Sequence, residues 1–589
     1  MKNKRSLVVV ALLGLSALTS GIAQAVDYTD AKPLSQVVKP NVQACGAIRP
    51  VPVPLIAWGG DMATILGNGN ADVTAKGSLF DTKGLSLKLY REDRFVKQVE
   101  DYLACKTPFL RGTVGMIAQA SDVINADPRT KPVPIYKLTD SEGGDVLVVR
   151  DSIKTPKDLC GKTVALQAYG PHVDLLTTVL KDAGCPGNVK IKWTKDITEN
   201  PKDKNSVYPA RALREDKSVD AVFVISPDAE ALTSGKGEGR VKGAWSLFST
   251  KTANRVIADV YVVRKDYYDA HPGMVESFVN GQMLAYEAAA KLVTDKDGKS
   301  KASYNAWLTA SAKMLLDSAS SVNDAAGMWG DARFAGWKGN VSFFADSNFP
   351  RRLDVLALEA GTAFGPAGLK LIGKAVSFVP ATFDYTKLGA GVVDKDSFEA
   401  SHFNKAAVDA LMRERQQKDT VSDGTLFTFE IRFKPNQQSF SSDLYKADFD
   451  RVVNLTSTYG GALLTIEGHA DTLEYLKRKG NTTATPEELS RMKQGAKNLT
   501  LQRANAVRDS LLGYAKSKKI TIDANQVTPI GYGFTKPNVA GCKLDQDGDV
   551  TVSCAPRSEE EWNAMRRVVF RVVSVEAESS QFEALGAKK

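Results

Sequence analysis

The chain has 589 residues, of which 43% are hydrophobic and 25% are charged. This balance is typical of a folded protein, and it excludes a wholly disordered chain, a collagen and a disulfide-stapled miniprotein. At about 100–200 residues per domain, the length allows three or more compact units. The net charge of +9 is spread along the chain without a run of five basic residues, so no nucleic-acid partner is predicted.

The first 25 residues have the three parts of a secretory signal peptide. Lys2, Lys4 and Arg5 precede an apolar run from Leu7 to Leu18, and Ala23-Gln24-Ala25 forms a small-x-small cleavage site. The apolar run is shorter than the about 20 residues that a membrane-spanning helix needs. A buried N-terminal helix is the alternative, but it explains neither the basic start nor the cleavage site. We therefore expect cleavage after about Ala25 and a mature protein in the periplasm.

The cysteine content agrees with export to an oxidising compartment. The chain has six cysteines, none of them in a C-x-x-C pair, and only four histidines, so disulfides are favoured over a zinc site and no metal or other cofactor is expected. Cys542 and Cys554 flank a polar, turn-rich stretch and form the most favoured pair. The remaining pairs, which sequence alone cannot fix, are taken as Cys160 with Cys185 and Cys45 with Cys105.

Short β-rich runs alternate with amphipathic helical segments between residues 50 and 390. The β-rich runs are 54–58, 84–90, 114–117, 146–149, 163–167, 189–193, 220–225 and 257–263, and helical periodicity is clearest over 95–103 and 171–183. Alternation of this kind predicts an α/β fold with a parallel or mixed sheet.

Two segments of this region carry a family resemblance. Residues 153–165, I-K-T-P-K-D-L-C-G-K-T-V-A, resemble the lobe entry of periplasmic substrate-binding proteins, and Ser218–Val222 resembles a strand of the same proteins. Their closest type is the receptor of ABC transporters for nitrate, sulfonate or thiamine precursors. The resemblance implies a two-lobed solute-binding domain over residues 26–390 with a ligand cleft between the lobes. Lobe 1 is expected at about 50–150 and 257–390, and lobe 2 at about 151–256.

Loops that follow strands and enter helices mark the expected cleft. In open α/β sheets ligands lie at the carboxyl ends of strands, and free N–H groups at helix N-termini bind anions. The aspartates in these loops make a cationic or polyhydroxyl ligand as reasonable as an anion, so the ligand is not predicted. Turn, cap and core roles are the alternative for each residue taken singly. The candidate cleft residues are Trp58, Gly59, Asp61, Ser121, Asp122, Tyr169, Gly170, His172, Ser226 and Asp228.

Residues 391–424 are expected to form a linker. The helix-like segment 404–417 places Ala407, Leu411 and Met412 on one face. A charged amphipathic helix of this kind is more often a solvated spacer than a membrane binder.

Residues 425–577 predict a small α+β domain with the order β-α-β-α-β-β, followed by a tail over 578–589. Four ordered motifs occur there: Thr465–Asp471 (T-I-E-G-H-A-D), Leu499–Val507 (L-T-L-Q-R-A-N-A-V), Ile530–Gly533 with Pro537, and Arg566-Arg567-Val568. Together they closely resemble the peptidoglycan-binding domain of OmpA-like proteins.

The resemblance assigns binding roles to Asp471 and Arg503. In the OmpA-like family an Asp at a strand end and an Arg on the next helix hold the free end of diaminopimelate in the stem peptide of the wall. An ionised aspartate can accept from the ligand's ammonium, and the planar guanidinium suits its carboxylate. A surface salt bridge between the two is the alternative. Arg567 is expected at the rim of the site or, equally, as a strand-edge charge, and His469 as a packed, hydrogen-bonded core residue.

The loop between these two residues departs from the family pattern. It is long and carries the basic stretch Lys477–Lys479, and Gly495-Ala496 stand where the family usually has Tyr-Asn. The insertion 472–497 is expected either to cover the site or to add a second contact with the wall.

The leading hypothesis is a periplasmic solute receptor tethered non-covalently to peptidoglycan. Its expected partners are the wall, an unidentified small molecule and an inner-membrane transporter or envelope complex. The first alternative is an envelope assembly protein whose receptor-like half serves as a docking scaffold. An enzyme would need a nucleophile paired with a base, and none is evident, so no catalytic residue is predicted.

Overall fold

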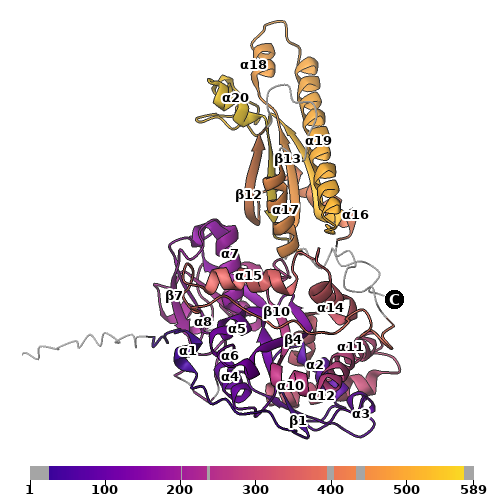
Figure 1. The fold of residues 1–589 in the computed structure, drawn as a ribbon. Coiled ribbons are helices and arrows are strands. Elements are labelled where there is room, and N and C mark those ends of the chain that lie inside the picture. Colours follow the sequence, from indigo (N-terminus) through magenta and orange to yellow (C-terminus); the bar gives the residue numbers. More distant parts are fainter. Residues whose placement is uncertain are drawn as a thin grey trace, which may run out of the picture.

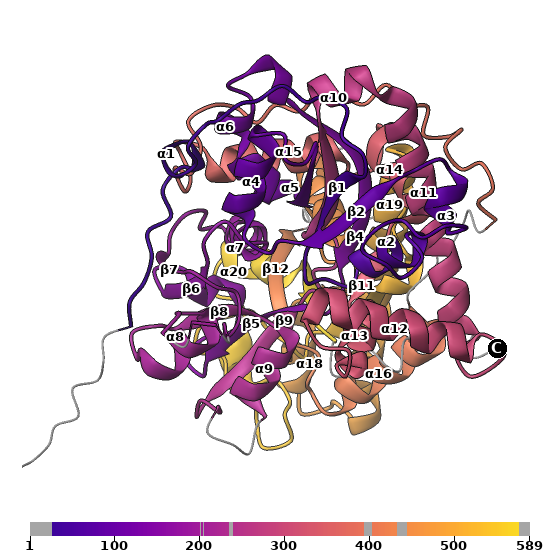
Figure 2. The ribbon, with the colours of Figure 1, turned by 90° about the horizontal axis from the view of Figure 1, so that it is seen from below.

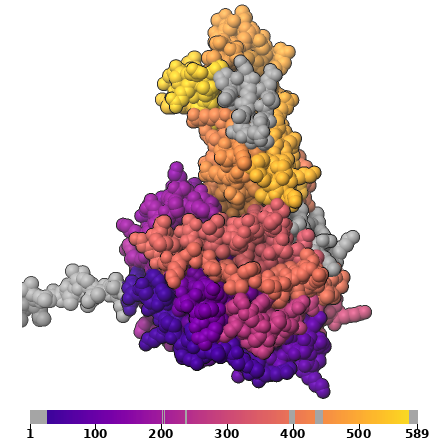
Figure 3. All heavy atoms as spheres, viewed as in Figure 1, coloured from indigo at the N-terminus to yellow at the C-terminus, as the bar shows by residue number. Residues whose placement is uncertain are grey.

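A computed structural model describes residues 26–200, 202–203, 205–234, 239–393, 403–432 and 445–575. The predicted signal peptide, the predicted tail and part of the predicted linker lie outside these ranges. The C-terminal domain stands on the broad two-lobed module that residues 26–393 form (Figures 1 and 3). Among the described residues, no helix is both long and apolar enough to cross a bilayer.

Lobe 1 contains strands that precede lobe 2 in the sequence and strands that follow it. Its main sheet has the order β11-β4-β10-β3, with β10 antiparallel to both β3 and β4, and β1 and β2 form a separate parallel pair. The strands are β1 (Val51–Leu55), β2 (Leu87–Arg91), β3 (Phe109–Thr113), β4 (Pro132–Ser141), β10 (Ala258–Arg264) and β11 (Ala332–Phe334). The centre of the main sheet is buried, because every residue of β4 and β10 is buried.

Helices cover both faces of this sheet (Figure 2). They are α1 (Leu34–Val37), α2 (Asp61–Gly67), α3 (Leu79–Thr82), α4 (Phe95–Leu103), α5 (Val114–Gln119), α6 (Ser121–Ile124), α10 (Lys265–Ala270), α11 (Pro272–Thr294), α12 (Lys301–Leu316), α13 (Val322–Gly330), α14 (Gly336–Ala345) and α15 (Leu353–Phe364). The β-rich run predicted at 114–117 is wrong, because this segment forms α5. Thr113 caps α5 by accepting the Met116 N–H at 3.0 Å, which outweighs the β propensity of the run.

Lobe 2 is a five-stranded sheet with the order β7-β6-β8-β5-β9. Its strands are β5 (Asp145–Arg150), β6 (Thr163–Gln167), β7 (Lys190–Thr194), β8 (Ala221–Ile225) and β9 (Ala244–Ser249), and its helices are α7 (His172–Asp182), α8 (Pro209–Glu215) and α9 (Ser226–Thr233). Parallel pairing of β6 with β7 and β8 matches the βαβ pattern of the sequence. The first boundary between the lobes differs from the expected residue 150, because β5 pairs with β8 and β9.

The C-terminal domain has its strands in the order β12-β15-β13-β14. The predicted order β-α-β-α-β-β lacks two helices that the structure has, α18 after β13 and α20 between β14 and β15. The strands are β12 (Thr425–Arg432), β13 (Leu463–His469), β14 (Val527–Gly533) and β15 (Arg567–Val573), and the helices are α16 (Lys405–Gln417), α17 (Lys446–Thr458), α18 (Leu473–Lys479), α19 (Pro486–Ser517) and α20 (Glu559–Met565). The expected long loop 472–497 instead forms α18 and the first part of α19, a hairpin at the far end of the domain (Figure 1).

The expected spacer helix belongs to this domain. The apolar side of α16, with Val408, Leu411 and Met412 buried, packs against β13, β14 and β15. It is therefore neither a solvated spacer nor a membrane-facing helix, because its apolar face has a partner within the chain.

Three disulfides are present among the described residues, with the connectivity that the sequence analysis favoured. Cys45 pairs with Cys105 in lobe 1, Cys160 with Cys185 in lobe 2, and Cys542 with Cys554 in the C-terminal domain. Each bridge lies within one folded unit, so none of them ties one unit to another.

Candidate functional site

Two short segments connect the lobes and meet beside each other. Residues 142–144 join β4 to β5, and residues 250–257 join β9 to β10. The Ser141 N–H donates to the Ile257 carbonyl at 3.0 Å, and the Thr250 hydroxyl accepts the Gly143 N–H at 2.9 Å. These connections form the hinge region of the two-lobed module.

Trp58 lies at this hinge. Its indole N–H donates to the Thr139 hydroxyl at 3.0 Å, and its ring leaves no room for a side chain at Gly144, where a Cβ would lie 2.6 Å from the ring. Gly59 is equally close-packed, because a Cβ there would meet the Met328 carbonyl oxygen at 1.9 Å. Trp58 therefore packs on the hinge at Gly144, whereas Gly59 packs against α13.

Asp61 is buried in lobe 1 and faces arginine instead of an open cleft. Arg111 Nε lies 3.2 Å from Asp61 Oδ1, and its Nη1 lies 2.6 Å from Asp259 Oδ1. The Tyr261 hydroxyl also donates to Asp61, at 3.2 Å. Burial raises the pKa of Asp61 to about 6, against the opposing effect of Arg111. This cluster holds β3, α2 and β10 together.

One contact between the lobes involves a residue that sequence reasoning missed. Asp174, on α7 of lobe 2, accepts a hydrogen bond from the Thr113 hydroxyl of lobe 1 at 2.9 Å. Its carboxylate occupies the space that a side chain at Gly115 would need, with Oδ1 only 1.6 Å from the Cβ position. Burial raises the pKa of Asp174 to about 7. Lobe 2 thus places its own acidic group at the start of α5. Only the folded structure reveals this contact, because Asp174 is distant in sequence from Thr113 and Gly115.

Two other predicted residues make polar contacts close to the hinge. His172 Nε2 lies 2.7 Å from Asp145 Oδ1, and both residues are buried within lobe 2. The Ser226 hydroxyl donates across the lobes to Asp331 Oδ2 at 3.2 Å. Ser226 also lines a polar hollow of about 310 Å³ together with Gly143, Ser249 and Lys251.

The remaining predicted cleft residues are directed elsewhere. Asp122 accepts the Gly373 and Lys374 N–H groups at 2.6 and 3.1 Å, which fastens the chain that follows α15. The Tyr169 hydroxyl donates to the Lys32 carbonyl at 2.7 Å, outside the hinge. Ser121 is buried, Gly170 packs against Gln167 of its own lobe, and Asp228 is influenced by Thr198, Arg214, Glu199 and His172, which all belong to lobe 2. The structure therefore does not bring the ten candidates together as one site.

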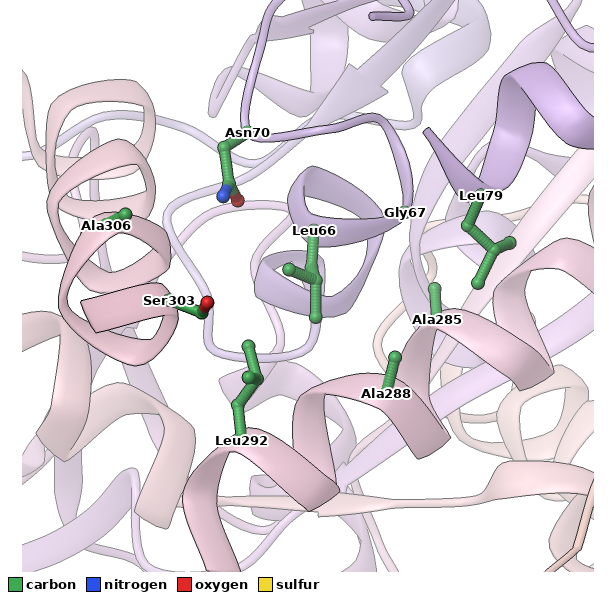
Figure 4. A pocket seen from close by; sticks show the side chains of 9 residues that line it. All are labelled: Leu66, Gly67, Asn70, Leu79, Ala285, Ala288, Leu292, Ser303 and Ala306. Carbon is green, nitrogen blue, oxygen red and sulfur yellow. The ribbon is translucent and has the colours of Figure 1, made fainter. Parts of the chain in front are cut away.

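A second cavity lies away from the hinge. It measures about 430 Å³ and is enclosed by helices α2, α11 and α12 and residues near α3 (Figure 4). Its lining is mostly aliphatic, and the polar side chains among its lining residues are those of Asn70 and Ser303.

In the C-terminal domain, close approach of α19 to the sheet positions Asp471 and Arg503. A Cβ at Gly468 would lie 2.3 Å from the Thr500 carbonyl oxygen, and one at Gly531 would lie 2.4 Å from that of Lys497. These two motif glycines therefore allow α19 to lie directly on β13 and β14. As a result, Arg503 of α19 lies within electrostatic range of Asp471, the second residue after β13.

Arg503 carries an uncompensated guanidinium. Burial and the nearby Arg566 lower its pKa, whereas Asp471 acts in the opposite direction. It forms no hydrogen bond or ion pair with the residues that the structure describes, and Asp471 uses only Oδ1, which accepts the Leu473 N–H at 3.1 Å. The site thus holds one carboxylate and two guanidinium groups within electrostatic range of one another.

The arginine that acts on Arg503 is Arg566. Its guanidinium carbon lies 3.5 Å from the ring centroid of Trp562, and Nη2 donates to Asn563 at 2.9 Å. Arg567 instead pairs with Glu430 on β12, with 3.3 Å between Nε and Oε1. Arg566 lies in the turn between α20 and β15, whereas Arg567 is the first residue of β15 and pairs along the sheet.

The expected environment of His469 is only half right. The ring is buried and stacks on Tyr532 with 5.3 Å between centroids, but neither ring nitrogen has a hydrogen-bond partner among the described residues. Burial, with nearby Arg567, lowers its pKa to about 3, so the ring is neutral. No group of three or more His, Cys, Asp or Glu side chains suited to a metal ion occurs in the described part of the chain.

Comparison with known proteins places similarities in the two-lobed module. Residues 80–292 match the family described as NMT1/THI5 like. Over 162 residues the chain is 28% identical to the taurine-binding periplasmic protein of Escherichia coli (strain K12), which covers 26% of this chain and 44% of that protein. The match thus spans less than half of that relative.

Solved structures show fold similarity at low identity. The periplasmic aliphatic sulphonate binding protein SsuA from Escherichia coli is 14% identical, with 56% of this chain and 90% of that chain covered and a TM-score of 0.38. The desulfurization enzyme DSZB is 16% identical, with 57% and 98% covered and a TM-score of 0.35.

Proposed function

We propose that this protein is a periplasmic solute-binding protein of the ABC-transporter type, held on peptidoglycan by its C-terminal domain. The family match over residues 80–292 and the two lobes joined by paired connections support the receptor half. Proteins built in this way capture a solute by closing the lobes around it.

The observation that carries the wall-binding half is the arrangement of Asp471, Arg503 and Arg566. The free end of diaminopimelate has an ammonium and a carboxylate on one carbon, so a complementary site needs both signs of charge close together. Asp471 offers a free Oδ2 for the ammonium, and unpartnered Arg503 offers a planar fork for the carboxylate. Arg566 gives the site a net positive charge, which suits a stem peptide with further carboxylates.

Sedimentation with purified sacculi tests this half. Wild type, Asp471→Ala and Arg503→Ala are compared with Arg413→Ala, which removes an exposed arginine from α16 on the same domain. We expect wild type and Arg413→Ala to pellet equally, the two site variants to stay in solution, and free meso-diaminopimelate to release the wild type. Equal pelleting of all four proteins would exclude these residues from the wall contact.

Native mass spectrometry and thermal shift of the full chain test the receptor half. Taurine and aliphatic sulfonates are the first probes, because they are what the named relatives bind. A melting temperature that rises with probe concentration supports solute binding by mass action.

A docking scaffold is the second candidate function. The contact between Thr113 and Asp174 favours it, since lobe 2 fills the start of α5 with its own carboxylate. Failure of broad metabolite sets to stabilise the full chain, with wall binding intact, would support the scaffold.

A further inference from the structure

The C-terminal domain rests on one of the two hinge connections. The turn Tyr459–Gly461, between α17 and β13, lies against residues 250–257, which join β9 to β10. In Figure 1 this end of the C-terminal domain meets the two-lobed module beside α7 and α15. The hinge connection is buried there, with Thr252 and Ala253 fully covered.

The fit between turn and connection depends on two glycines. A Cβ at Gly461 would lie 1.7 Å from the Lys251 carbonyl oxygen, and one at Gly460 would lie 2.6 Å from Asn254 Oδ1. Both values are far below van der Waals contact, so the Gly461 backbone touches the Lys251 backbone directly and the Gly460 backbone touches the Asn254 side chain. Neither glycine has a positive φ, so contact and not backbone conformation explains the residue type.

Hydrogen bonds fix the same contact. The Gly461 N–H donates to the Thr252 carbonyl at 3.1 Å, and the Thr252 hydroxyl lies 3.0 Å from that of Ser574, just after β15. The Tyr459 hydroxyl donates to Asp182 at the end of α7, at 3.0 Å. The C-terminal domain is therefore hydrogen-bonded to both the hinge connection and lobe 2.

Apolar packing continues through the contact without interruption. The Tyr459 ring is completely buried between Phe248 of β9 and Phe427 of β12, with centroids 6.4 and 5.0 Å apart. One hydrophobic core runs from lobe 2 through Ala253 and Val256 into the C-terminal domain. Domains joined only by a flexible linker do not share a core in this way.

Opening of a two-lobed protein needs changes of φ and ψ in the segments between its lobes. Residues 250–257 cannot change their φ and ψ angles freely while the turn Tyr459–Gly461 is packed on them. The connection 142–144 is constrained with them, because Thr250 accepts the Gly143 N–H and Ser141 donates to Ile257. We propose that the C-terminal domain is a clamp on the hinge, so that the lobes open only when the Tyr459–Gly461 turn leaves residues 250–257. This coupling depends on neither the wall ligand nor the solute.

Hydrogen–deuterium exchange on the full chain tests the clamp. Gly461→Ala places a methyl group on the Lys251 carbonyl, whereas Gly513→Ala adds one to α19 where no atom lies within 4 Å. Peptides over 250–257 report undocking, peptides over α5 report separation of Thr113 from Asp174, and β13 and β15 report the integrity of the domain. We expect Gly461→Ala to speed exchange about tenfold or more at both 250–257 and α5, with β13, β15 and the Gly513→Ala protein unchanged.

Faster exchange at 250–257 with α5 unchanged would overturn the proposal, because the domain would then undock without freeing the lobes. Unchanged exchange at both segments would overturn it as well. If Gly461→Ala also exposes β13 and β15, Tyr459→Phe replaces it, since this variant keeps the ring and loses only the bond to Asp182. For Tyr459→Phe, too, faster exchange at 250–257 with α5 unchanged, or unchanged exchange at both segments, would overturn the proposal.

Discussion

The Tyr459 hydroxyl donates a 3.0 Å hydrogen bond to Asp182 Oδ2, which joins the end of α17 in the C-terminal domain to the last residue of α7 in lobe 2. Tyr459 is fully buried, and burial raises the pKa of Asp182. A half-buried carboxylate depends in part on its donors, so this single bond has consequences for the stability of both units.

Tyr459→Phe should lower the free energy of unfolding by about 1–3 kcal/mol, because it leaves an acceptor of Asp182 buried without its donor. The matched control is Tyr514→Phe, whose hydroxyl donates to Asp450 at the surface. We expect that variant to change stability by less than about 0.5 kcal/mol. Urea unfolding at neutral pH measures both, and equal losses would contradict a special role for the interface.

Asp174 should make stability fall as the pH rises. Its pKa in the folded protein is raised to about 7, so between about pH 4 and 7 the folded state keeps a proton that the unfolded state has released. Stability therefore decreases across that window and stays at the lower level above it. Each unit of pKa shift corresponds to about 1.4 kcal/mol, which sets an upper limit of a few kcal/mol.

Asp174→Asn removes this charge and keeps an oxygen to accept from Thr113. Relative to wild type, the variant should gain stability at pH 8 and gain little at pH 4. Asp61 titrates in the same direction in both proteins, with a pKa raised to about 6, so the difference between the proteins isolates Asp174. Asp354→Asn, at a side chain that is 70% exposed, serves as control. A difference that does not vary with pH would disprove the assignment.

His469 should have the opposite pH dependence. Burial lowers the pKa of this histidine to about 3, so below about pH 6.5 the unfolded state takes up a proton that the folded state does not. Stability is lost as the pH falls through that range. His469→Phe keeps a ring against Tyr532 and removes two buried nitrogens without partners, so the C-terminal domain should resist acid better. His271→Phe, whose ring lies 4.5 Å from that of Tyr267, is the control, and equal acid midpoints for all three proteins would contradict the prediction.

Local patterns predicted most strands and helices because their periodicity is a property of consecutive residues. The helix predicted over 95–103 and the strand at 163–167 have the observed bounds of α4 and β6. The cleft was predicted poorly because its contacts join distant segments. Asp122 lies 251 residues before its partner Gly373, and Asp174 lies 61 residues after Thr113. No pattern of neighbouring residues in the sequence predicts contacts between such distant residues.

In the C-terminal domain the motifs single out Asp471 and Arg503, and the structure places the two within electrostatic range of each other, while their role in wall binding stays a prediction. Arg567 was predicted either at the rim of the site or, equally, as a strand-edge charge, and its pairing with Glu430 fits the second interpretation. The position of each of the two adjacent arginines has a geometric basis. It depends on which residue begins β15, and α20 ends at Met565 so that Arg566 lies in the turn and Arg567 in the strand. Boundaries between elements are where sequence patterns are least exact.

Arg566 and Arg567 offer the sharpest test of the proposed wall site. Arg566 stacks on Trp562 and lies close enough to Arg503 to lower its pKa, whereas Arg567 pairs with Glu430 at the neighbouring strand. Arg566→Gln should therefore weaken binding to sacculi about 10–100-fold, the loss expected for charge-assisted hydrogen bonds, without lowering the melting temperature. Arg567→Gln should lower the melting temperature and leave binding unchanged. Trp562→Leu should behave like a milder Arg566→Gln, because the guanidinium loses the ring that orients it. Weaker binding in Arg567→Gln, with Arg566→Gln unaffected, would reverse the assignment and return the rim of the site to β15.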